Sequence, residues 1–174
     1  HKEYRRQRQM CIRDRQVTGV EALLRWLHPV KGMISPARFI PIAEENGFII
    51  TLGQWVLESA CQQLSDWAKY PQTAHLSMAV NVSAGQFARD EFVQDVLEIL
   101  ERTQAPAHLL KLELTESALV MRVEDIIEKM TVLKRYGVVF SLDDFGTGYS
   151  SLTYLQRIPI CLLYTSDAAD DTPC

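Results

Sequence analysis

The stretch Leu76-Ser-Met-Ala-Val-Asn-Val82 decides the fold, because its side chains alternate in character with a period of two residues. A β-strand turns successive side chains to opposite faces of its sheet, so Leu, Met and Val share one face and Asn81 lies on the other. Residues 109–115 and 138–143 repeat this alternation, and one face of each becomes polar towards its C-terminal end. Together with residues 18–26, these stretches predict four β-strands.

Amphipathic helices are predicted between these strands, at residues 36–45, 54–70, 90–102 and 123–136. Strands and helices that alternate at intervals of about 30 residues indicate βαβ units and a parallel sheet. An open sheet covered on both faces would contain nearly continuous apolar runs, whereas each of these strands has one apolar and one polar face. The pattern therefore favours an α/β fold of the (β/α) barrel type, with helices outside, over an open doubly wound sheet.

Composition and charge exclude several classes of protein. Of the 174 residues, 47% are hydrophobic and 23% are charged, as in soluble globular domains. The net charge of -4 offers no basic field to nucleic acid. No apolar run approaches the roughly 20 residues that cross a bilayer, and the polar, basic N-terminus does not resemble a secretory signal. We therefore expect a cytoplasmic protein without membrane contact from this segment.

The four cysteines predict neither a disulfide framework nor a metal site. Cys11, Cys61, Cys161 and Cys174 contain no C-x-x-C pair and have no metal-ligand spacing with the four histidines. We expect free thiols in a reducing compartment.

Acidic and amide side chains recur on the polar faces of the predicted strands. Each lies in or at the C-terminal half of a strand, and the set is Glu21, Asn81, Glu113, Asp143 and the adjacent Asp144. The C-terminal ends of barrel strands converge on one mouth, where carboxylates repel one another unless cations neutralise them. Oxygen ligands without His or Cys select hard divalent ions such as Mg²⁺ or Mn²⁺. The pattern predicts a metal site.

The same residues also have purely structural interpretations, which the sequence leaves open. A glutamate in a strand is commonly a surface residue, and Asn81 can serve the turn that follows its strand. Asp143 and Asp144 can cap the next segment. Lys111 shares the face of Glu113 and can form an interior ion pair with it.

Two further features are compatible with a phosphate ligand. The βα loop Asp144-Phe-Gly-Thr-Gly-Tyr-Ser-Ser151 contains two glycines, which permit close approach to a phosphate, although most such loops contain glycine. Arg25 follows Glu21 by four residues in the predicted strand, so it shares the inward phase. Arg25 is then either a bidentate partner of an anionic substrate or a solvated residue at the strand end.

Five motifs resemble those of the EAL domain family, in order and spacing. They are Val20-Glu-Ala-Leu-Leu-Arg-Trp26, Phe39-Ile-Pro-Ile-Ala-Glu-Glu-Asn-Gly47, Asn81-Val-Ser83, Glu113-Leu-Thr-Glu116 and Asp143-Asp-Phe-Gly-Thr-Gly-Tyr-Ser-Ser151. The resemblance implies a modified TIM barrel that hydrolyses the bacterial second messenger cyclic di-GMP to linear pGpG. It implies two-metal catalysis with Mg²⁺ or Mn²⁺.

The resemblance also implies a role for each matching residue. The family's metal ligands fall on Glu21, Asn81, Glu113, Asp143 and Asp144. Arg25 falls on an arginine that contacts substrate phosphate. Glu116 falls on a glutamate that anchors the flexible loop at residues 145–151.

The two ends of the sequence depart from the family pattern. Residues 1–15 and 161–174 resemble translated read-through of sequencing adapters, so we expect them to be non-family tails around a partial EAL domain at residues 16–160. After Pro159-Ile160 the family continues with a Lys-Ile-Asp strand and later strands that carry a glutamate and a glutamine. Because the sequence lacks these motifs, we expect the 174-residue chain to be catalytically inactive and poorly stable.

Three functional interpretations therefore stay open. The chain is part of a cyclic di-GMP phosphodiesterase, part of a module that binds cyclic di-GMP without cleaving it, or a fragment without function as written. Cyclic di-GMP is the expected partner, nucleic acid polymers are not, and the resemblance leaves a homodimer of the intact parent open.

Overall fold

The computed structural model describes residues 17–115, 123–145 and 162–165, and the side chains of residues 124–142 within the second of these ranges. The strands are β1 (Gly19–Ala22), β2 (Trp26–His28), β3 (Gly32–Ile34), β4 (Ser77–Val82), β5 (Leu110–Thr115), β6 (Val139–Phe145) and β7 (Leu162–Thr165). The helices are α1 (Pro36–Glu45), α2 (Phe48–Trp67), α3 (Ala84–Phe87), α4 (Phe92–Thr103) and α5 (Val123–Arg135), with a 3-10 turn η1 (Ala107–Leu109) before β5.

A parallel sheet organises the chain. Its five strands lie in the order β1-β4-β5-β6-β7, and every neighbouring pair is parallel. The spatial order follows the chain order without a reversal, whereas doubly wound sheets reverse direction at a switch point. This is the strand order of a (β/α) barrel, as the alternation of the strands predicts.

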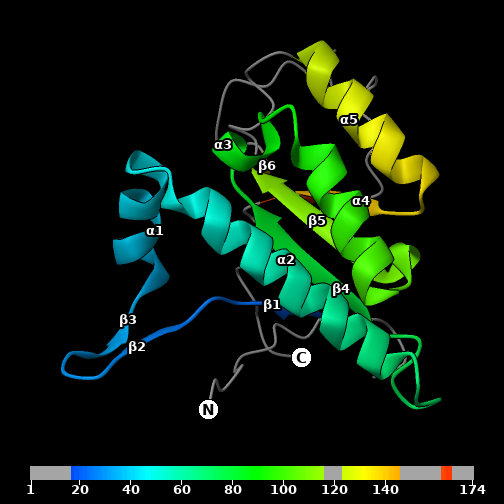
Figure 1. Cartoon of the computed structure of the whole chain (residues 1–174), viewed down its shortest axis with the longest axis horizontal. Helices are drawn as coiled ribbons and strands as arrows, with labels where there is room; N and C mark the ends of the chain where they lie inside the picture. Colours follow the sequence, from blue (N-terminus) through cyan, green and yellow to red (C-terminus); the bar gives the residue numbers. More distant parts are fainter. Residues whose placement is uncertain (1–16, 116–122, 146–161, 166–174) are drawn as a thin grey trace.

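The helices cover one face of this sheet. Figure 1 shows α2, α4 and α5 lying across the same side of the strands. Buried residues of these helices, such as Leu64, Val96 and Met130, join one apolar cluster with strand residues such as Leu112 and Phe140. The predicted alternation is confirmed, because the apolar phase of β4, β5 and β6 enters this cluster. The polar phase is left on the opposite face of the sheet.

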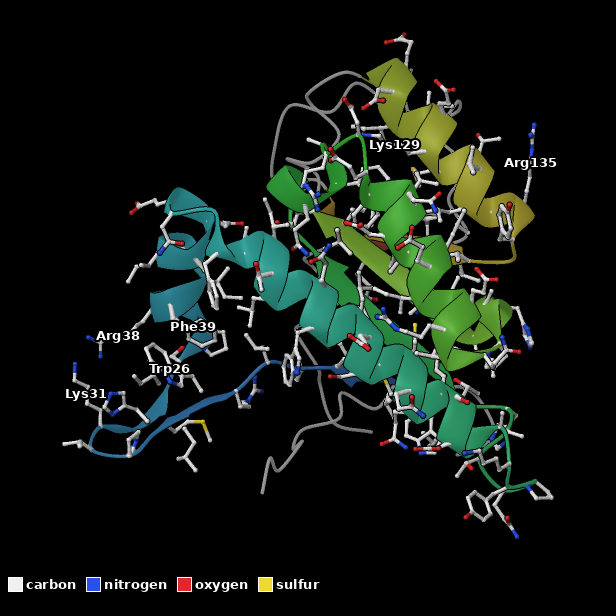
Figure 2. All side chains as sticks on the ribbon, viewed as in Figure 1. Trp26, Lys31, Arg38, Phe39, Lys129 and Arg135 are labelled. Atoms are coloured by element: carbon white, nitrogen blue, oxygen red, sulfur yellow. The ribbon has the colours of Figure 1, made fainter. Side chains whose placement is uncertain are left out.

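The first strand is shorter than predicted. β1 ends at Ala22, and the chain then forms a separate antiparallel hairpin of β2 and β3 in place of a strand over residues 18–26. The ring of His28 stabilises the hairpin turn, since its Nδ1 accepts hydrogen bonds from two backbone N–H groups. Trp26 and Phe39 of α1 lie side by side (Figure 2), and their rings pack edge-on with centroids 5.6 Å apart. The hairpin is therefore held by α1 and not by the main sheet.

Helix α2 starts at Phe48, six residues before the predicted start at residue 54. Gly53 makes this segment a poor helix candidate from sequence, because glycine destabilises a helix interior. In the fold, the side chain of Gln86 occupies the space where a Cβ of Gly53 would lie. Tertiary packing thus explains both the glycine and the longer helix.

The last described strand, β7, belongs to the main sheet. β7 lies within residues 161–174, which the sequence analysis sets apart as a tail, and it pairs with β6 through Ser141 and Leu162. The domain boundaries stay a prediction.

Among the helices of the described ranges, none is long and apolar enough to cross a membrane.

Candidate functional site

The polar face of the sheet brings three of the predicted site residues to neighbouring strands. Asn81, Glu113 and Ser141 are Cα partners in one row across β4, β5 and β6. Glu21 on β1 pairs with Ala79, two residues before Asn81 on the same face of β4. The three predicted residues, Glu21, Asn81 and Glu113, lie in the C-terminal halves of their strands, where active sites of parallel β/α folds are built.

Glu21 and Asn81 form a direct pair. Asn81 Nδ2 donates a hydrogen bond to Glu21 Oε1 at 2.8 Å. Asn81 is exposed and Glu21 is half-buried, so the pair lies at the surface of the site. Because the amide nitrogen is used by Glu21, the atom that Asn81 can offer to a cation is its Oδ1. This arrangement orients one carboxylate and one amide oxygen side by side.

Glu113 is held through one of its oxygens. Ser141 Oγ donates to Glu113 Oε1 at 3.1 Å, and Lys111 Nζ lies 3.9 Å from the same oxygen. The side chains of Lys111 and Glu113 are each only 11% exposed. The interior ion pair that the sequence leaves open is therefore present. It gives Glu113 a counter-charge from within the protein.

The described side chains supply some of the oxygen atoms of the predicted cation site, and this site stays a prediction. Glu21, Asn81 and Glu113 carry side-chain oxygens of the kind that hard divalent ions prefer. Asp143 is the Cα partner of Thr115, two residues beyond Ser141 on β6. Among the described side chains, no group of three or more His, Cys, Asp or Glu residues gathers into a metal cluster.

Three predicted site residues lie partly or wholly outside this description. The side chains of Asp143 and Asp144 are not among those described, and Glu116 lies outside the described residues altogether. The loop at residues 145–151 lies outside them from residue 146 onward. Their roles stay predictions.

Arg25 is not part of the strand that carries Glu21. β1 ends at Ala22. The prediction that Arg25 lies on the same strand and faces the same way as Glu21 is therefore wrong. The half-buried Arg25 side chain instead donates from Nη1 to the carbonyl oxygen of Leu24 at 2.7 Å. Its proposed contact with a phosphate stays a prediction that rests on the family motif.

One buried lysine, on α5, was not recognised from the sequence. Lys129 of α5 donates to the carbonyl oxygens of Phe87, Ala88 and Arg89 at 3.2, 3.1 and 2.9 Å. It also forms an ion pair of 3.0 Å with Asp125. Figure 2 shows Lys129 on α5 near the end of α3. Its signal in the sequence is a lysine three residues after Ile126, on the apolar face of the predicted helix.

Lys129 supports the connection that follows β4. This connection begins directly after Asn81-Val82, where Ser83 and Gln86 form a capping box at the start of α3. Lys129 binds the opposite end of the same short helix. α3 is thus fixed at both ends, and with it the backbone that leaves the site.

The one described cysteine is not reactive. Cys61 is a free thiol, as predicted, and it lies on the buried side of α2 in the core. Burial raises the pKa of the Cys61 thiol to about 12, so the thiolate that reacts with electrophiles is not formed at neutral pH. The other three cysteines lie outside the described residues.

Comparison with known proteins places this arrangement in a family. A profile described as "EAL domain" matches residues 5–164. The bifunctional diguanylate cyclase/cyclic di-GMP phosphodiesterase MucR of Pseudomonas aeruginosa is 46% identical over 142 residues, which cover 81% of this chain and 20% of that protein. The cyclic di-GMP phosphodiesterase NbdA of the same organism is 42% identical over 151 residues, covering 87% and 19%. The chain thus spans about a fifth of the length of these relatives.

Solved structures give the same result for the fold. The PaMucR phosphodiesterase in complex with c-di-GMP superimposes with a TM-score of 0.83 at 42% identity, covering 90% of this chain and 65% of that chain. The EAL enzyme Bd1971, in its cAMP- and cyclic-di-GMP-bound form, gives a TM-score of 0.79 at 32% identity, covering 87% and 42%. These neighbours have the TIM-barrel-like fold, so the predicted partial barrel is confirmed.

Proposed function

Because the chain belongs to the EAL domain family, we propose that it is part of a cytoplasmic phosphodiesterase that hydrolyses cyclic di-GMP to linear pGpG in bacterial signalling. One observation carries the proposal: Glu21 and Asn81 are hydrogen-bonded beside Glu113 on neighbouring parallel strands. The names of two relatives support the proposal: MucR is a bifunctional diguanylate cyclase/cyclic di-GMP phosphodiesterase and NbdA is a cyclic di-GMP phosphodiesterase. We do not expect nucleic acid polymers as substrates. The intact protein could form a homodimer, as the family resemblance leaves open.

The acidic residues would hold divalent cations. The ligands are Glu21, Asn81, Glu113, Asp143 and Asp144, and the cation is Mg²⁺ or Mn²⁺. Such ions, when bound, lower the pKa of a coordinated water and stabilise the charge that develops on the leaving oxygen.

The protein's own groups orient this chemistry. Asn81 holds Glu21 through Oε1, and Ser141 and Lys111 hold Glu113 through Oε1. Both carboxylates therefore have a fixed orientation. Arg25 would bind a phosphate of the substrate. Glu116 would anchor the loop at residues 145–151 against the site.

The test is binding of cyclic di-GMP by the 174-residue chain in Mn²⁺, measured by isothermal titration calorimetry. We expect binding that requires Mn²⁺ and is lost in Glu21→Ala, because the variant removes a ligand without touching the apolar core. The matched control is Glu98→Ala, which removes an exposed carboxylate of α4 that pairs only with Gln94 in the described contacts. Equal binding by Glu21→Ala and Glu98→Ala would show that Glu21 is not a ligand.

A second function deserves a test of its own, a module that binds cyclic di-GMP without cleaving it. The observation that favours it is the Lys111–Glu113 pair, since a glutamate already compensated by lysine has less need of a metal. Both functions predict binding, and only the enzyme produces pGpG. Product formation therefore separates them.

A further inference from the structure

Lys111 is a buried cation on the inward face of the sheet. It is 9% exposed and lies on β5, two residues before Glu113 and on the same face. Its Cα partners are Ala79 on β4 and Val139 on β6, which carry no charge. Burying a lysine ammonium is costly unless a counter-charge lies close to it. Glu113 supplies such a charge at 3.9 Å.

Two groups act on the same oxygen of Glu113. Ser141 Oγ donates a hydrogen bond to Oε1. The ammonium of Lys111, two residues earlier on β5, forms an ion pair with the same oxygen. The side chains of Lys111 and Glu113 are each 11% exposed, so water screens their charges poorly and their attraction is larger than that of a surface pair. The orientation of the Glu113 carboxylate therefore depends on Lys111.

We propose that Lys111 is a positioning residue of the cation site, which holds Glu113 through Oε1 and lowers the affinity of the site for divalent cations. The inference rests on the proposed function, because it takes Glu113 as a cation ligand. A divalent ion at Glu113 and the ammonium of Lys111 repel each other and attract the same carboxylate. Lys111 thus sets how tightly the site binds its ion.

A merely structural ion pair would behave differently. Removing Lys111 from such a pair would lower stability by leaving Glu113 buried without a counter-charge, whether or not a divalent ion is present. In a cation site, the ion can replace the missing ammonium. The variant would then become more dependent on the ion for its stability, since a ligand that binds only the native state stabilises it.

The experiment uses the 174-residue chain, freed of metal with EDTA, and Mn²⁺ as the probe. Mn²⁺ affinity is measured by calorimetry, and the thermal midpoint is measured with and without saturating Mn²⁺. For Lys111→Met we expect Mn²⁺ affinity to rise by about tenfold. We also expect a larger Mn²⁺-induced rise of the thermal midpoint than in the unmodified chain.

Two variants serve as controls. Lys111→Arg keeps the charge and should keep the original affinity. Lys134→Met makes the same charge change at an exposed position of α5, the helix that packs on the opposite face of the sheet, and should leave affinity unchanged.

Each outcome decides between the alternatives. If the unmodified chain binds Mn²⁺ and Lys111→Met binds it equally or more weakly, the role of Lys111 is refuted and the proposed function stands. If neither protein binds Mn²⁺, both the role of Lys111 and the proposed metal site fail. If Lys111→Met is unfolded without metal, Mn²⁺ should restore its native circular dichroism, and a variant that stays unfolded in Mn²⁺ refutes the inference.

Discussion

At the scale of single residues, the hydrogen bond between Asn81 and Glu21 connects the fold to the chemistry. Asn81 is exposed, so it contributes little to stability through burial. Asn81 Nδ2 orients the Glu21 carboxylate through a hydrogen bond of 2.8 Å to Oε1, and Asn81 Oδ1 can bind a cation. Stability and cation affinity should therefore respond differently to its removal.

We predict that Asn81→Ala weakens Mn²⁺ binding by about tenfold, within the range expected when a partner of a metal ligand is lost. The free energy of unfolding should change by less than about 0.5 kcal/mol. Calorimetry and urea denaturation give the two quantities. Gln94→Ala is the matched control, because it removes an exposed amide that donates to a glutamate on α4. Equal Mn²⁺ affinity in the two variants would remove Asn81 from the site.

At the scale of elements, Lys129 joins α5 to the end of α3. The residue is 6% exposed, and its ammonium contacts three consecutive carbonyl oxygens and one carboxylate. The carbonyls of Phe87, Ala88 and Arg89 follow the last turn of α3, where a cation is favourable. An apolar replacement leaves these groups and Asp125 without this partner.

We predict that Lys129→Met lowers the free energy of unfolding by about 3 kcal/mol, because it breaks a buried charged contact. Lys134→Met on the same helix is exposed and should cost less than about 0.5 kcal/mol. Urea denaturation followed by circular dichroism measures both values. A loss below about 1 kcal/mol for Lys129→Met would show that water or neighbouring donors replace the ammonium.

The elements also show which features a sequence can predict. The period of two in β4, β5 and β6 is a local property, so the inward placement of Asn81 and Glu113 could be predicted. The hairpin of β2 and β3 could not, because it depends on the contact of Trp26 with Phe39 and on the ring of His28. The shared contact of Ser141 and Lys111 with Glu113 depends on the register between β5 and β6, which no local pattern contains.

At the scale of the whole molecule, the described residues form part of a barrel-like fold, a five-stranded parallel sheet with helices on one face. The opposite face holds Glu21, Asn81 and Glu113 in an arrangement shared between three parallel strands. A site divided among strands needs the whole sheet to keep its geometry. The proposed hydrolysis is therefore best measured where this sheet is intact.

The most direct measurement is hydrolysis by a hybrid in which residues 19–145 of this chain replace the matching segment of the MucR phosphodiesterase, 46% identical to the chain over 142 residues. With Mg²⁺ or Mn²⁺, we predict that the hybrid converts cyclic di-GMP to pGpG, detected by chromatography. Glu21→Ala in the hybrid should abolish turnover, and Glu98→Ala should preserve it. A folded hybrid that binds cyclic di-GMP and forms no pGpG, or one that keeps full turnover after Glu21→Ala, would contradict the account.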